Sequence, residues 1–168
     1  MKVEFKKSFP KDKPLRIIVE KLVRAVAKYC RVISLTEVVN IKHGTACGMA
    51  RRGSYIYEDS KSEIDVTLSK RFRPDSYLFT AERFVEICIH EFGHVRDFHE
   101  RLPKNIYDDY GRSWNWKNKW AKRPHERRAC AYVEQKNKDL PVAIQELILE
   151  AAIEYEAYRD RAEKGWFS

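Results

Sequence analysis

Five consecutive residues, His90-Glu91-Phe92-Gly93-His94, form the pattern H-E-x-x-H, whose residue types and spacing suit a metal ion. Residues four apart on an α-helix project from the same face, about one turn apart. Two imidazoles placed in this way can bind one zinc ion, and the glutamate between them can act as general base on a water molecule beside the metal. The pattern therefore predicts a zinc site with His90 and His94 as ligands and Glu91 as the catalytic base.

The helix that carries this motif is predicted to be buried, because apolar residues lie almost all around it. One stripe is the exception, and it comprises Glu86, His90, His94, Asp97 and Arg101. The two histidines and Asp97 are therefore expected to face one side, toward a cleft or solvent. Glu91 lies between this stripe and the apolar side, where a carboxylate needs a partner.

A catalytic zinc usually has three protein ligands and one open position, so a third ligand is expected elsewhere in the chain. His99 is disfavoured, because it lies nearly opposite His90 on a continuous helix; it is expected to be a surface histidine or one that supports a ligand from behind. The metzincin pattern would require Gly and His at the positions of Arg96 and Glu100, so that class is disfavoured.

Glu126 is the favoured third ligand. It begins the apolar stripe of a later predicted helix, where a glutamate is rare unless it is paired or bound to a metal. Ala129 on the same stripe would let this helix approach the H-E-x-x-H helix closely. Two alternatives stay open: His125 as the ligand, or a salt bridge from Glu126 to Arg96 or Arg127.

Periodicity and turn residues predict an alternation of strands and helices along the chain. Strands are predicted at residues 2–9, 32–42 and 64–69, and in a glycine-punctuated segment that ends at residues 55–57. Helices are predicted at residues 14–30, 80–102 and 124–138, and from Pro141 to before Gly165. Thr80 is the predicted N-cap of the second helix, with Glu82 in its first turn. This order indicates an α+β fold, with a small antiparallel or mixed sheet and helices packed on it.

The composition indicates one globular domain over residues 1–168, since 43% of the residues are hydrophobic and 35% are charged. The chain has no apolar run of transmembrane length, and its first residues lack the apolar core of a signal peptide, so we expect a cytoplasmic protein without membrane contact. The four cysteines form no C-x-x-C pair and are expected to be free buried thiols in a reducing compartment. They are Cys30, Cys47, Cys88 and Cys130.

A net charge of +8 favours an acidic partner such as nucleic acid. The segment 111–123 carries interleaved aromatic and basic residues, chiefly Trp114, Trp116, Lys117, Lys119 and Trp120. Tryptophans can stack on bases while cations follow phosphates, so this loop is a candidate contact to single-stranded nucleic acid. Two alternatives remain: a lid or wall of the substrate site, and a loop packed on the helices.

The chain resembles the zincin metallopeptidases of the gluzincin kind, in particular the small ImmA/IrrE-type and SprT-like enzymes. The resemblance rests on Thr80-Ala81-Glu82, His90-Glu91-Phe92-Gly93-His94 and Glu126-Arg127-Arg128-Ala129. It implies a zincin-like fold and, in the ImmA/IrrE type, a glutamate of an E-x-x-A helix as third ligand, whereas SprT-like proteins use a third histidine. The first type, or a phage relative of it, is therefore favoured.

Residues 47–50 and 64–69 resemble the family's strand pair before the active-site helix. One strand of that pair is an edge strand, which in zincins holds an extended peptide by β-augmentation.

These observations together predict a zinc-dependent metallopeptidase, phage or bacterial, that hydrolyses peptide bonds in a protein or peptide substrate. Tyr132, His125 and Tyr107 are candidate donors to the oxyanion, and Asp97 is a candidate to orient a ligand histidine. The alternative is a nucleic-acid- or virion-associated binding protein whose zincin site is structural or vestigial. The intact Glu91 argues for the enzyme, because a purely structural site has no need of it. The oligomeric state stays open.

Overall fold

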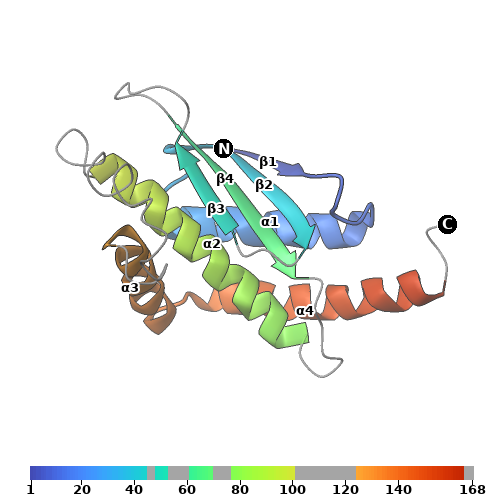
Figure 1. Ribbon diagram of the computed structural model, residues 1–168. Helices are drawn as coiled ribbons and strands as arrows, with labels where there is room; N and C mark the ends of the chain where they lie inside the picture. Colours follow the sequence, from blue (N-terminus) through green and yellow to red (C-terminus); the bar gives the residue numbers. More distant parts are fainter. Residues whose placement is uncertain (45–47, 53–60, 70–76, 101–123, 165–168) are drawn as a thin grey trace, which may run out of the picture.

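The structure is a computed structural model that describes residues 1–44, 48–52, 61–69, 77–100 and 124–164 (Figure 1). Its strands are β1 (Lys2–Phe5), β2 (Thr36–Gly44), β3 (Gly48–Arg52) and β4 (Ser62–Ser69). Its helices are α1 (Lys13–Tyr29), α2 (Tyr77–Glu100), α3 (Pro124–Lys138) and α4 (Val142–Glu163). Among these described residues, the order β1-α1-β2-β3-β4-α2-α3-α4 confirms the predicted α+β class.

The strands form one mixed sheet in the order β1-β2-β4-β3. β1, β2 and β4 run parallel, and α1 makes the crossover connection that the parallel pairing of β1 with β2 requires. β3 lies at one edge and pairs antiparallel with β4, so that Gly48 lies opposite Val66 and Arg52 opposite Ser62. The mixed sheet is one of the two arrangements that the sequence allowed.

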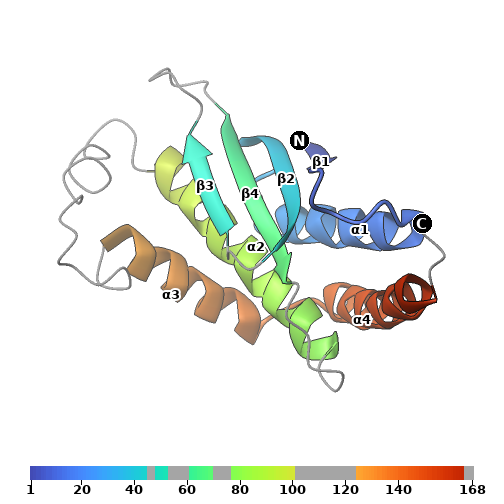
Figure 2. The ribbon, with the colours of Figure 1, turned by 45° about the vertical axis from the view of Figure 1, so that its right-hand side comes forward.

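The core lies between one face of this sheet and three helices. Alternate residues of β2 and β4 point into it, and Val39, Ile41, Ile64 and Val66 are all fully buried. They join one apolar cluster with residues of α1, α2 and α4. In Figure 2 the strands cross in front of α1 and α2, and α4 runs below them. This packing fixes α2, the helix of the H-E-x-x-H motif, against β3 and β4.

The first helix is held by a capping residue that also contacts the last helix. Asp12 accepts a hydrogen bond from the backbone amide of Leu15 at 2.9 Å, and a proline lies in the first turn of α1. The same carboxylate accepts two hydrogen bonds from the Arg161 guanidinium of α4, at 2.9 and 3.0 Å. One buried carboxylate thus caps the N-terminus of α1 and links α4 to this helix.

The predicted start of α2 is wrong by three residues. The helix begins at Tyr77, so Thr80 is an interior, buried residue rather than the N-cap, and Glu82 lies beyond the first turn. A tertiary contact accounts for the difference: the Tyr77 ring lies 6.3 Å from the Tyr155 ring of α4, centroid to centroid. Packing on α4 therefore extends the helix past the polar residue that would otherwise cap it.

The first two strands also differ from their predicted bounds. β1 ends at Phe5, because the chain then turns and buries Phe9, whose ring lies 4.8 Å from that of Phe5. β2 begins at Thr36, whose hydroxyl donates to the Val32 carbonyl at 2.8 Å and closes the turn before the strand. Within the glycine-punctuated segment predicted to end in a strand at residues 55–57, residues 48–52 form β3, and residues 53–57 lie outside the described residues.

Two of the predicted buried thiols are confirmed and one is wrong. Cys30 and Cys88 are free and buried, whereas Cys130 on α3 is free and exposed. Cys47 lies outside the described residues. Of the helices that the structure describes, none combines the length and the apolarity needed to cross a membrane.

Candidate metal centre

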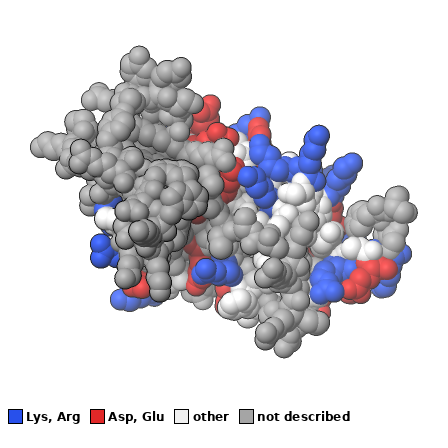
Figure 3. Space-filling model, in the orientation of Figure 1, with Lys and Arg blue, Asp and Glu red and all other residues white. Residues whose placement is uncertain are grey.

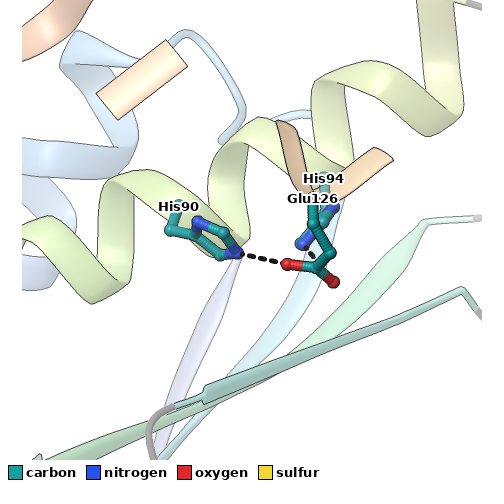
Figure 4. A group of neighbouring side chains, drawn as sticks. All are labelled: His90, His94 and Glu126. Carbon is teal, nitrogen blue, oxygen red and sulfur yellow. Dashed lines mark hydrogen bonds and ion pairs between the residues drawn. The ribbon is translucent and has the colours of Figure 1, made fainter. Parts of the chain in front are cut away.

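Three side chains from two helices converge at one point between α2 and α3 (Figure 4). His90 and His94 project from α2, and Glu126 approaches them from the first turn of α3. His90 Nε2 lies 3.1 Å from Glu126 Oε2, and His94 Nε2 lies 3.6 Å from Glu126 Oε1. One ligand atom from each residue lies within 4.8 Å of the other two. The structure thus brings together the two motif histidines and the favoured third ligand.

The donor set and its spacing fit zinc. Two imidazole nitrogens and one carboxylate oxygen are the ligand set of many catalytic zinc sites. A tetrahedral zinc with ligand distances of 2.0–2.2 Å holds its ligand atoms about 3.3–3.6 Å apart. His90 Nε2 and His94 Nε2 lie 3.1 and 3.6 Å from different oxygens of Glu126, and one ligand atom from each residue lies within 4.8 Å of the others. The three ligand atoms are therefore close to the separations that a bound zinc ion would require.

Glu126 is buried, with an exposed fraction of 3%, and three imidazoles surround its carboxylate. Burial alone would raise the pKa of Glu126, but hydrogen bonds from His125, His90 and His94 outweigh it and hold the pKa well below its usual range. The carboxylate is therefore ionised at neutral pH, which is the form that binds a cation.

A close contact of α2 with α3 positions Glu126. Ala129 of α3 is 2% exposed, and Gly93 of α2 lies against it. A Cβ atom at residue 93 would lie 3.1 Å from Tyr132 Cδ1 and 3.4 Å from Ala129 Cα. The glycine inside H-E-x-x-H and the alanine inside E-x-x-A therefore allow the two ligand-bearing helices to approach.

A second link between the same helices lies one turn beyond His94. The Arg128 guanidinium donates to both carboxylate oxygens of Asp97, through Nε and Nη2, each at 2.7 Å. Asp97 is 9% exposed, so this bidentate pair is largely shielded from water. The expected role of Asp97 in orienting a ligand histidine stays a prediction. The contact that the structure gives it instead holds α3, and with it Glu126, in place.

The polar stripe of α2, which is expected to face a cleft or solvent, lies against α3. Glu86 and His90 are partly covered, while His94 and Asp97 are buried beneath α3. Glu91 is buried as expected, with an exposed fraction of 5%. The stripe lies at a helix–helix interface, so its histidines and aspartate find their hydrogen-bond partners on α3.

The proposed oxyanion donors have different outcomes. Tyr132 packs between helices: its hydroxyl donates to the Cys30 carbonyl at 3.3 Å and its ring lies over Gly93. Its role as an oxyanion donor stays a prediction. His125 is buried, and its Nε2 lies 3.3 Å from Glu126 Oε1, so it is adjacent to the cluster. Tyr107 lies outside the described residues.

The aromatic and basic loop also lies outside the described residues, with Trp114, Trp116, Lys117, Lys119 and Trp120. Its interpretations as a nucleic-acid contact, a lid or a packed loop stay predictions.

Two neighbours of the cluster were not identified from the sequence. No local sequence pattern indicates that Arg128 pairs with Asp97, because the two residues are 31 positions apart in the chain. Cys130 is expected to be buried, but it is exposed, and its Sγ lies 3.9 Å from His90 Nδ1. Its position one helical turn after Glu126 could have indicated this, since residues i and i+4 share a face. The suggested salt bridge from Glu126 to Arg96 is not formed; Arg96 pairs with Glu100 on its own helix.

Comparisons of the chain with models of known protein families, with curated proteins and with solved structures find no match.

Proposed function

We propose that this protein is a zinc-dependent metallopeptidase with a zincin-like domain. One observation carries the proposal: two histidines at helical spacing and a buried glutamate from a separate helix place three ligand atoms within 4.8 Å of one another. A glutamate stands between the histidines in sequence, as a hydrolytic site of this kind requires. A closed structural zinc site would normally take four protein ligands, whereas three leave a position for a substrate.

His90, His94 and Glu126 would hold the ion. When bound, zinc supplies a Lewis acid that polarises a carbonyl oxygen and lowers the pKa of water toward about 7. The protein contributes a ligand set on two packed helices, held in register by the Gly93–Ala129 contact and the Asp97–Arg128 pair. Such positioning on rigid elements keeps the site in its productive geometry.

Glu91 is the proposed general base. It directly follows His90 on α2, and its side chain is shielded from bulk solvent. We expect this carboxylate to take the proton of the attacking water as the new C–O bond forms. It then delivers the proton to the leaving nitrogen as the peptide C–N bond breaks.

The edge strand supports a peptide as substrate. Among the strands that the structure describes, β3 (Gly48–Arg52) pairs only with β4, and it lies next to α2. An unpaired strand edge can add an extended peptide through main-chain hydrogen bonds. A peptide bound there would run beside the helix that carries His90, Glu91 and His94. The resemblance to zincins implies the same arrangement.

Zinc content tests the metal assignment first. Mass spectrometry of the purified protein should find one zinc per chain in the wild type. Glu126→Ala should lose it, whereas His99→Ala and the exposed α3 variant Glu134→Ala should keep it. Metal-replete wild type without zinc would overturn the proposal, and so would a Glu126→Ala variant that retains a full equivalent.

Hydrolysis tests the role of Glu91. Glu91→Gln should keep its zinc but cleave a mixed peptide library about 10²–10⁴-fold more slowly than the wild type, the usual contribution of a general base. Glu100→Gln, at the exposed end of the same helix, is the matched control and should cleave normally. A fully active Glu91→Gln enzyme would assign the base to another group.

A further inference from the structure

A groove of about 430 Å³ lies between the first turns of α2 and the first half of α4. Its apolar lining includes Leu78 and Val85 of α2 and Ile148 and Leu149 of α4, and the α3–α4 connection adds Leu140. The groove is separate from the metal cluster, because none of the three ligand residues lines it.

The apolar surface continues out of the groove onto the outer face of α4. Val142, Leu149 and Ile153 are 67%, 53% and 68% exposed. Their spacing of seven and four residues places them in one narrow stripe, about 16 Å long at 1.5 Å per residue. On the α2 side, Phe79 is 65% exposed next to Leu78. Apolar side chains that share one face in this way mark an interaction site more often than scattered ones do.

Carboxylates border this apolar stripe on both sides. Glu82 of α2 lines the groove, and Glu146 and Glu150 follow the opposite side of α4. All three are exposed, and in the part of the chain that the structure describes none of them forms an ion pair. Between residues 142 and 156, α4 contains four glutamates and no lysine or arginine.

This border is unusual for a chain whose net charge is +8. Basic side chains gather elsewhere, for example over β1 on the face shown in Figure 3. In that region Lys2 is exposed, and both Lys2 and Lys6 pair with Glu4, whereas no described lysine or arginine pairs with Glu82, Glu146 or Glu150. The α2–α4 surface thus combines an apolar stripe with polar lining residues, among them Glu86, which pairs with Arg83, and exposed glutamates border the stripe.

We propose that the α2–α4 groove docks an amphipathic helix of a partner protein that carries lysines or arginines beside its apolar stripe. A helix fits because the surface is a straight stripe of about three turns beside a groove, the geometry of helix-in-groove recognition. Apolar side chains of the partner would bury Leu149, Ile153 and Leu78, and its cations would meet the glutamates of both borders. The proposal does not depend on the metal or on peptidase activity.

A model peptide tests it with the full chain. The probe is a fluorescein-labelled helical peptide of leucine and lysine, with leucines at i, i+3 and i+4 spacing. Two control peptides are used: the same peptide with glutamate in place of lysine, and a leucine–lysine peptide of shuffled sequence. The net positive charge of the protein repels a cationic peptide in general, so binding of the first probe alone would point to this acidic surface. Fluorescence anisotropy should rise with the leucine–lysine helix and not with the other two.

Replacing single apolar residues by lysine locates the binding site. Leu149→Lys and Ile153→Lys should each weaken binding of the leucine–lysine helix about tenfold or more, as expected for central anchor residues. Ile17→Lys, an exposed isoleucine of α1 away from the groove, makes the same change and should bind like the wild type. All substituted side chains are exposed, and circular dichroism should be unchanged.

Three results would overturn the proposal. One is equal binding of all three peptides, or of none, by the wild type. Another is wild-type affinity in both groove variants. The third is a wild-type dimer in light scattering that Leu149→Lys dissociates while the peptide does not bind, which would assign the surface to a second copy of this chain.

Discussion

Removing the Arg128 guanidinium should destabilise the metal-free protein by about 3 kcal/mol. This side chain donates two hydrogen bonds of 2.7 Å to Asp97, which is 9% exposed. Hydrogen bonds to charged groups contribute about 1.5–3 kcal/mol each, and ordering an arginine costs up to about 2 kcal/mol. The expected loss in the free energy of unfolding therefore lies near the lower end of the 3–5 kcal/mol that breaking a buried ion pair costs, because the Arg128 side chain is still 26% exposed.

The measurement is a double-mutant cycle in urea, with chelator present so that metal binding does not contribute. Asp97→Ala, Arg128→Ala and the double variant should show a coupling free energy of about 2 kcal/mol. For a chain of this size, a loss of about 3 kcal/mol lowers Tm by roughly 6–12 °C. Arg127→Ala, the neighbouring exposed arginine of α3, is the matched control and should change stability by less than about 0.5 kcal/mol.

The same variant should also weaken zinc binding, since Arg128 lies two residues after Glu126 and anchors the turn that carries it. Competition against a chromophoric chelator should show about a tenfold loss of affinity in Arg128→Ala and none in Arg127→Ala. Additive single-variant effects, with a coupling below about 0.5 kcal/mol, would refute the reasoning. Equal losses in the two arginine variants would do so as well.

Three further results are expected. Gly93→Val should lower the free energy of unfolding in urea by about 1–3 kcal/mol and should bind zinc more weakly, since its Cβ would press on Tyr132 and the α3 backbone. Gly93→Ala should lose less stability, because alanine favours the helical conformation. Burial raises the pKa of Tyr132 to about 12, so the folded protein keeps the phenol proton at pH values where the unfolded chain, with a pKa of about 10, loses it. The free energy of unfolding should therefore fall from pH 10 to 12, and it should fall less steeply in Tyr132→Phe. Equal slopes in the wild type and Tyr132→Phe would contradict this prediction. Dithionitrobenzoate should modify Cys130 before Cys30 or Cys88 in the native protein, and Cys130→Ser should remove that fast phase.

The local part of this site could be predicted from the sequence, because helical spacing determines it. His90 and His94 share a face by being four residues apart, and the structure keeps them so. Glu126 could be found for an energetic reason: a carboxylate on an apolar helix face needs a compensating partner. Neither inference needed knowledge of the tertiary fold.

What could not be predicted depends on contacts between distant segments. Arg128 reaches Asp97 only because α3 packs on α2, and no periodicity in either helix encodes that pairing. Tyr77 joins α2 because it meets Tyr155, which lies 78 residues later in the chain. The mixed character of the sheet depends on β3 reversing to pair with β4, a choice that alternation of apolar residues leaves open.

The composition of the α2–α3 interface links metal binding to the stability of α3. Only His125, Glu126 and Ala129 of this helix are buried, so two of its three buried side chains are polar groups of the cluster. Burying an ionised carboxylate is favourable only while the surrounding imidazoles compensate it. A bound cation would compensate it more strongly and would connect α3 to His90 and His94 directly. A ligand that binds only the folded form stabilises it by mass action. Glu126, which would bind zinc, therefore also helps to hold α3 on the domain, beside the Asp97–Arg128 pair. Loss of the metal should weaken the attachment of α3 before it affects the core of α1, α2 and the sheet.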